Sequence, residues 1–126
     1  MKIASTIARY LLGIIFLVFG LNGFLQFLPM TTPPGLAGQY FQVLAASHYL
    51  PVIFICQLIP AILLLINRYV PLALTVLAAV IVNIVCFHVL MAPSGLPLAL
   101  IVVLLWFLVF ASVRSAFAGI FQQRAG

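Results

Sequence analysis

A chain of 126 residues with no Asp, no Glu and only five Lys or Arg is not an ordinary water-soluble domain, in which about a quarter of the residues are charged. Its residues are 67% hydrophobic and its mean hydropathy is +1.43, which indicates an integral membrane protein. The missing acids exclude catalysis by a pair of carboxylates. They also exclude transport that depends on an acidic residue in the membrane, as in the small multidrug exporters.

The apolar stretches predict four membrane-spanning helices, because a helix needs about 20 mostly apolar residues to cross the hydrocarbon core. Backbone groups in lipid must be paired, so the alternative is a closed barrel, whose strands would alternate apolar and polar residues. Runs such as LTVLAAVIV do not alternate. The sequence therefore predicts an all-α, integral membrane four-helix bundle, a single domain over residues 1–126. We expect its spans at residues 10–28, 51–66, 70–91 and 96–113.

The cations predict the orientation of these helices, because cytoplasmic loops are enriched in Lys and Arg. Lys2 and Arg9 precede the first predicted span, Arg68 lies between the second and third, and Arg114 and Arg124 follow the fourth. Both termini are therefore expected to be cytoplasmic. The cations are dispersed, so we expect them to meet anionic lipid headgroups and expect no binding of nucleic acid. The first span is too long for the apolar part of a signal peptide, so we expect it to be retained.

The first predicted span combines small and polar residues. Gly13, Gly20 and Gly23 lie along one stripe, which is typical of close packing between membrane helices. Asn22 and Gln26 are four residues apart, so in a continuous helix they share a face. That face lies roughly opposite the stripe of Gly13 and Gly20, which predicts a helix inside the bundle.

The segment between the first two spans opens with a proline-rich stretch. Residues 36–49 then have a helical pattern, with Tyr40, Phe41, Leu44 and His48 on or near one face. This pattern favours an interfacial helix on the outer leaflet. A plain loop with aromatic anchors is the alternative.

The second and third spans add polar groups at a similar predicted depth. Pro60 deprives the Cys56 carbonyl of its helical hydrogen-bond donor. Polar residues inside a membrane are candidates for function, so we expect an outer-side ligand pocket. Its candidate residues are Asn22, Gln26, Gln57, Asn83 and His88. The alternative is that these side chains only hydrogen-bond the helices to one another.

Catalytic and metal-binding groups are sparse. His48 and His88 have no carboxylate or thiolate beside them, so we expect no metal site. Cys56 and Cys86 lie at different distances from the predicted turn, which disfavours a disulfide, and we interpret both as buried small residues. Because no nucleophile and base pair is visible, we assign no catalytic residues and do not expect enzymatic activity from this chain alone.

The chain resembles the DoxX-like family of small four-helix membrane proteins. The resemblance rests on GIIFLVFGLNGFLQFLP, QLIPAILLLINRYVPLAL and VNIVCFH, which contain Asn22, Gln57, Asn83 and His88. It implies a bundle of four helices. Members of this family include membrane subunits linked to thiosulfate–quinone oxidoreduction and to redox-stress complexes, and related proteins assist the assembly of other membrane proteins. Where relatives often have glycines, this chain has Pro60 followed by Ala61.

The residues and the resemblance together lead to two hypotheses. In the first, the chain is a multi-pass subunit of a bacterial inner membrane, in contact with the lipid bilayer. It holds a lipophilic molecule, with a quinone as one candidate, in the outer-side pocket and serves a redox partner. In the second, it is an assembly or chaperone factor for a client membrane protein and needs no small-molecule ligand.

Overall fold

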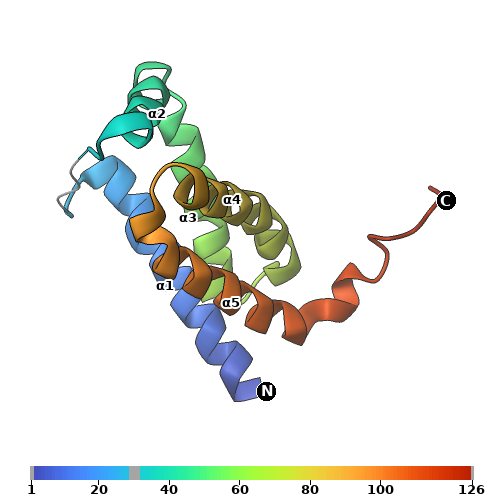
Figure 1. Cartoon of the computed structure of the whole chain (residues 1–126). Helices are drawn as coiled ribbons and strands as arrows, with labels where there is room; N and C mark the ends of the chain where they lie inside the picture. The colour runs from blue at the N-terminus through green and yellow to red at the C-terminus, as the bar shows by residue number, and fades with distance from the viewer. Residues whose placement is uncertain (1, 29–31, 126) are drawn as a thin grey trace.

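The computed structural model describes residues 2–28 and 32–125, and all of its regular structure is helical over these ranges (Figure 1). Two short 3₁₀ helices, η1 and η2, flank the last long helix. The elements are α1 (Lys2–Leu25), α2 (Gly35–Ala46), α3 (Leu50–Leu65), α4 (Val70–Leu90), η1 (Pro93–Gly95), α5 (Leu96–Val113) and η2 (Arg114–Phe117).

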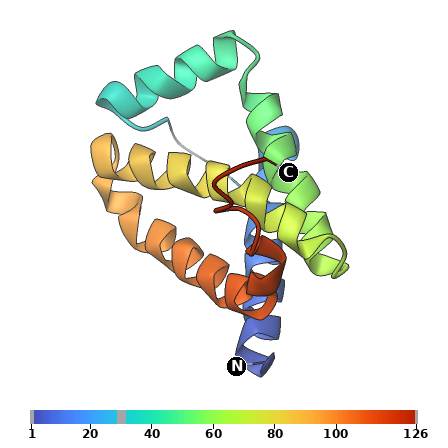
Figure 2. The same cartoon turned by 90° about the vertical axis from the view of Figure 1, so that its right-hand side faces the viewer.

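Four of the helices pack in a closed order. α1 packs along α3 and α5, and α4 completes the set by packing against α3 and α5 (Figures 1 and 2). α1 and α3 are antiparallel, because Gly13 faces Leu65 whereas Gly23 faces Phe54. α2 stands apart from the four and meets α3 at a bend of 90°.

The described helices are consistent with the predicted integral membrane protein, with one qualification about the second span. α1, α4 and the segment Pro93–Phe117 are each long and apolar enough to cross a membrane. The bent pair of α2 and α3 counts as a fourth candidate span only when the two helices are taken together. α3 alone has 16 residues and rises about 24 Å, less than the ~30 Å of a typical hydrocarbon core.

The predicted boundaries of the first helix are wrong at both ends. α1 begins at Lys2, so Lys2 and Arg9 are part of the helix instead of preceding it. It ends at Leu25, before the predicted end at residue 28. A helix was predicted over residues 36–49, and α2 occupies Gly35–Ala46.

The ends of α2 and α3 share one hydrogen-bonding pattern. After α3, the Asn67 N–H donates to the Leu64 carbonyl at 3.3 Å and the Arg68 N–H donates to the Leu63 carbonyl at 3.0 Å. Asn67 has a φ of 56°, and the corresponding residue after α2, His48, has a φ of 61°. This is the Schellman motif, which satisfies the last carbonyls of a helix and turns the chain sharply.

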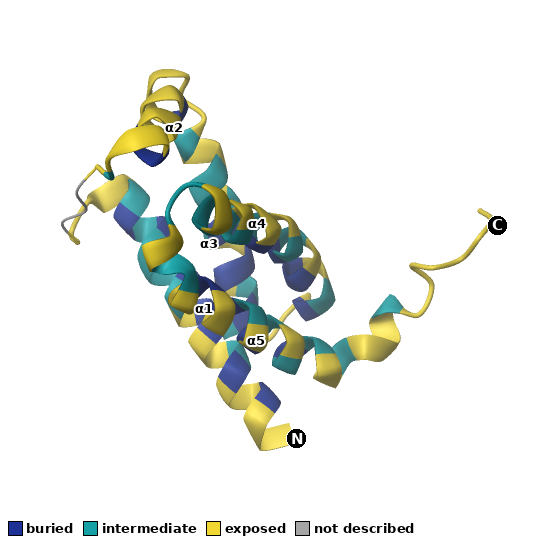
Figure 3. Cartoon of the chain, in the orientation of Figure 1, coloured by how far each residue is buried: buried dark blue, intermediate teal, exposed yellow. Residues whose placement is uncertain are grey.

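The core lies where the inward faces of the four packed helices meet (Figure 3). The glycine stripe of α1 is confirmed as a packing surface, because Gly13, Gly20 and Gly23 each face a side chain of α3. Most outward side chains of these helices are apolar and exposed, as expected for a surface that contacts lipid. The core is formed by Ala8, Leu12, Phe16, Ala61, Leu64, Val70, Ala73, Leu74, Leu77, Ile81, Val102, Leu105 and Val109.

Candidate functional site

The two amides of the first predicted span lie in different environments. Asn22 is 7% exposed, and its Oδ1 accepts a hydrogen bond of 2.7 Å from the Leu28 N–H. Asn22 thus binds the chain that leaves α1. Gln26 lies just beyond the end of α1, has a φ of 52° and is exposed. The inference that the two amides share a helix face is therefore wrong, because the helix stops before it reaches Gln26.

Gln57 is the one amide side chain in α3. It is 8% exposed, and its side chain takes part in none of the hydrogen bonds found among the described residues. Its neighbour Leu58 faces Gly20, and Phe54 faces Gly23. Gln57 and Asn22 therefore belong to the same level of the contact between α1 and α3.

Asn83 and His88 of α4 both hydrogen-bond to nearby backbone carbonyls, Asn83 within the helix and His88 in the turn that follows it. Asn83 is exposed, and its Nδ2 donates to the Ala79 carbonyl at 2.8 Å. His88 is half-buried, and its Nδ1 lies 3.1 Å from the Ala92 carbonyl oxygen. A Cβ on Gly95 would lie 2.3 Å from the His88 ring, so glycine allows the turn before α5 to pack on the imidazole. His88 thus orders the turn between α4 and α5.

Only two of the five candidate residues are buried, and none of the five lines the two apolar cavities described next. The larger cavity is an apolar groove of about 350 Å³ between α4 and α5, called the α4–α5 groove below. Its lining residues are Ala78, Ile81, Val82, Val85, Cys86, Val103, Trp106 and Phe107. The smaller cavity has about 180 Å³ and lies between α3 and α4, beside Cys56 and Pro60.

Trp106 fixes one wall of the α4–α5 groove. Its Nε1 donates to the Leu74 carbonyl of α4 at 2.9 Å. Its ring stacks on Phe110, with the ring centroids 5.3 Å apart and the planes at 10°. The indole N–H is therefore hydrogen-bonded within the protein, and the apolar part of the indole ring lines the groove. Trp106 was not among the residues predicted from the sequence, although a lone tryptophan beside Phe107 in an apolar helix was a signal.

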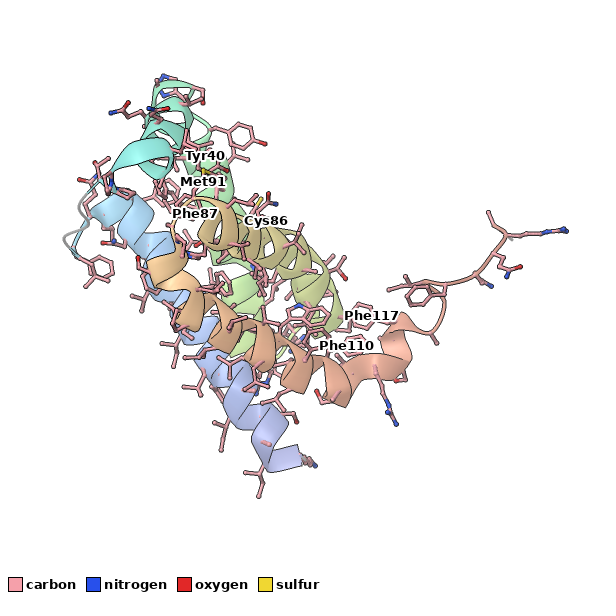
Figure 4. The ribbon with its side chains drawn as sticks, viewed as in Figure 1. Tyr40, Cys86, Phe87, Met91, Phe110 and Phe117 are labelled. Carbon is pink, nitrogen blue, oxygen red and sulfur yellow. The ribbon has the colours of Figure 1, made fainter. Side chains whose placement is uncertain are left out.

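An aromatic cluster connects α2 to the last turns of α4. The centroid of the Phe87 ring lies 5.7 Å from that of Tyr40, 5.3 Å from that of Phe41 and 5.2 Å from that of His88. Figure 4 shows Tyr40, Phe87 and Met91 gathered where α2 approaches α4. The cluster holds α2 over the end of α4, since the backbones of these two helices make few close contacts.

Changing Phe87 to alanine is expected to loosen α2, because Phe87 is the ring that both Tyr40 and Phe41 contact. Hydrogen exchange of the α2 amides should become faster in this variant, while exchange in α1 and α5 stays unchanged. Phe107→Ala is the matched control, because Phe107 is exposed on α5 and makes no ring contact with α2. Equal exchange in the two variants would show that other contacts hold α2.

The two cysteines are both free thiols, one half-buried and one exposed. The interpretation of Cys86 as a buried residue is therefore wrong, because its position on α4 faces outward. Within residues 2–28 and 32–125, His, Cys, Asp and Glu form no group of three that could hold a metal ion.

Comparisons of the chain with known protein families, with curated proteins and with solved structures found no match.

Proposed function

We propose that this integral membrane protein is a subunit that binds a lipophilic molecule, whose apolar chain lies in the α4–α5 groove. The observation that carries the proposal is the groove itself. It has a volume of about 350 Å³, its lining is apolar, and Trp106 and Phe107 form part of its wall. Binding sites for small lipophilic molecules are typically concave, apolar and aromatic.

A quinone remains our leading candidate for the ligand, and a redox protein for the partner. An isoprenoid tail matches this apolar groove, because its strongest potential hydrogen-bond donor, the Trp106 N–H, is already bound to the Leu74 carbonyl. The quinone head would need a polar group beyond the groove. The proposed membership of the DoxX-like family points to the same ligand class, as does the proposed bacterial inner membrane.

We also propose that both termini are cytoplasmic, with α2 lying on the outer leaflet. The Arg9 guanidinium donates to the Leu64 carbonyl in the last turn of α3, so Arg9 and Arg68 belong to one end of the bundle. Because Trp106 in the second half of α5 bonds to Leu74 in the first half of α4, Arg114 belongs to that end too. Cations at a single end support this orientation.

The second proposal, an assembly factor without a small-molecule ligand, has its own support. Asn22, Asn83 and His88 all make hydrogen bonds to backbone atoms within the chain. Their presence in apolar helices is therefore explained without a ligand, as for amides that only stabilise membrane helices.

Filling the groove tests the first proposal. We expect mass spectrometry of the gently purified protein to detect a retained lipophilic molecule. Ala78→Phe should abolish retention, because Ala78 lines the groove and a phenyl ring would occupy it. Leu104→Phe is the matched control, because Leu104 is exposed on α5 and does not line the groove. Added short-chain quinone should quench the fluorescence of Trp106, the only tryptophan, in the control and not in Ala78→Phe.

Two results would count against the groove as a binding site. One is a wild-type protein that retains no lipophilic molecule, and the other is retention that Ala78→Phe does not change. A stoichiometric client protein that co-purifies without any retained small molecule would favour the assembly factor.

A further inference from the structure

The outward face of α4 differs from the outward faces of the other packed helices. At 100° per residue, the exposed positions of α4 fall within an arc of about 120°; they are 72, 75, 79, 82, 83, 86, 89 and 90. This surface, called the α4 face below, includes Thr75, Ala79, Asn83 and Cys86. The exposed residues of α3 are all apolar. In the described chain, Asn83 is the one exposed amide that lies inside a long apolar helix and away from its ends.

Asn83 has unused hydrogen-bonding capacity on this face. One N–H of its Nδ2 is bound to the Ala79 carbonyl. The second N–H and the Oδ1 have no partner among the hydrogen bonds of the described residues. Asn83 is seven residues from Leu90, which corresponds to about 10 Å of helix. A polar group at this depth that faces lipid is costly, so it favours contact with another polar group.

We propose that the α4 face is the interface of a homodimer, in which a second copy of this chain packs α4 against α4. The cations at one end of the bundle favour the same orientation for every copy, so a two-fold axis along the membrane normal brings equal depths together. Asn83 then meets Asn83 of the second copy. The pairing is self-complementary, because each amide supplies both a donor and an acceptor.

The other residues of the α4 face are also compatible with packing against a second copy of the chain. Ala79, Thr75 and Cys86 are small, which allows two helix backbones to approach closely. Thr75 already donates its hydroxyl to the Pro71 carbonyl at 2.9 Å, so its polar atom needs no further partner. No charged residue lies on the face, so nothing on it repels a second copy. Val82 and Cys86 also border the α4–α5 groove, but the dimer does not depend on a ligand there.

The native thiol of Cys86 provides the test. Two Cys86 side chains should meet across the axis, where copper phenanthroline and oxygen can oxidise the two thiols to one disulfide. In membranes that contain the Cys56→Ala variant, we expect a cross-linked dimer. When Asn83→Leu is combined with Cys56→Ala, the yield of cross-linked dimer should fall about fivefold to thirtyfold, as expected for the loss of an interhelical amide bond. Asn83→Gln in the same background should retain the yield.

The controls use other faces of the same bundle. Cys86→Ala leaves only Cys56, on α3, and should give no dimer. In a cysteine-free background, Val82→Cys should cross-link and Ile59→Cys, which is exposed on α3, should not. The proposal is overturned if Cys86 forms no dimer, if Ile59→Cys cross-links equally well, or if Asn83→Leu leaves the yield unchanged. A cross-link from Cys86 to a different protein would also overturn it.

Discussion

Replacing Gly23 with leucine is expected to destabilise the folded protein by about 3 kcal/mol, the upper part of the range for overpacking. A Cβ at this position would lie 2.3 Å from Cδ2 and 2.4 Å from Cγ of Phe54. The ring cannot retreat freely, because its centroid lies 6.0 Å from that of Phe24 in an edge contact. α1 and α3 must therefore separate at this level, where Asn22 and Gln57 are buried.

The measurement is an unfolding titration with SDS in bicelles, followed by circular dichroism. Gly23→Ala should have an intermediate effect, because its single methyl group already requires the Phe54 ring to shift. Gly119→Leu is the control, since the only atom near a Cβ there is the Gln122 Oε1 at 4.0 Å. If Gly23→Leu and Gly119→Leu unfolded at the same SDS fraction, close packing of α1 on α3 would not be needed for stability.

Replacing Trp106 with alanine should have the second large effect, also about 3 kcal/mol, by analogy with the loss of an aromatic core residue. The change removes the stacking on Phe110 and the hydrogen bond to the Leu74 carbonyl, which joins α5 to α4. It also removes one wall of the α4–α5 groove. A lower free energy of unfolding and a loss of retained lipophilic molecules should therefore occur together.

Two neighbouring variants separate these contributions. Trp106→Phe keeps an aromatic wall but loses the hydrogen bond and one ring of the indole, so it should cost at least about 1 kcal/mol and less than Trp106→Ala. Phe107→Ala removes an exposed ring that lines the same groove, and it should lower ligand retention with little change in stability. If the Trp106→Ala variant had the same free energy of unfolding as the wild type, α4 and α5 would be held together mainly by the buried aliphatic residues.

The apolar runs predicted the helices well and their ends poorly. Hydropathy identifies the part of a helix that lies in lipid, whereas the backbone of α1 continues through Arg9 to Lys2. A long cationic side chain can keep its charge at the polar boundary while its stem lies along apolar surface. The close approach of α1 and α3 was predictable, because glycines at a helical spacing have few other uses in a membrane helix.

The candidate site was less predictable, because hydrogen-bond partners depend on where each helix stops. The sequence pattern places Asn22 and Gln26 on one face only if α1 continues, and Asn22 itself binds the segment after the helix. The α4–α5 groove was not predicted either. It is formed by side chains of two helices that have no distinguishing periodicity, and its shape depends on the hydrogen bond between Trp106 and Leu74.

The short length of α3 has a consequence for the surrounding lipid. α3 lies alongside α1, but its 16 residues fall about 6 Å short of a typical hydrocarbon core. This is a hydrophobic mismatch, and acyl chains beside α3 must compress, at a cost of a fraction of a kcal/mol per ångström. The bilayer around the protein is therefore expected to be thinner beside α3 than beside α4 and α5. The thickness of a bilayer, in addition to its lipid composition, then influences which membranes and which neighbouring proteins suit this protein.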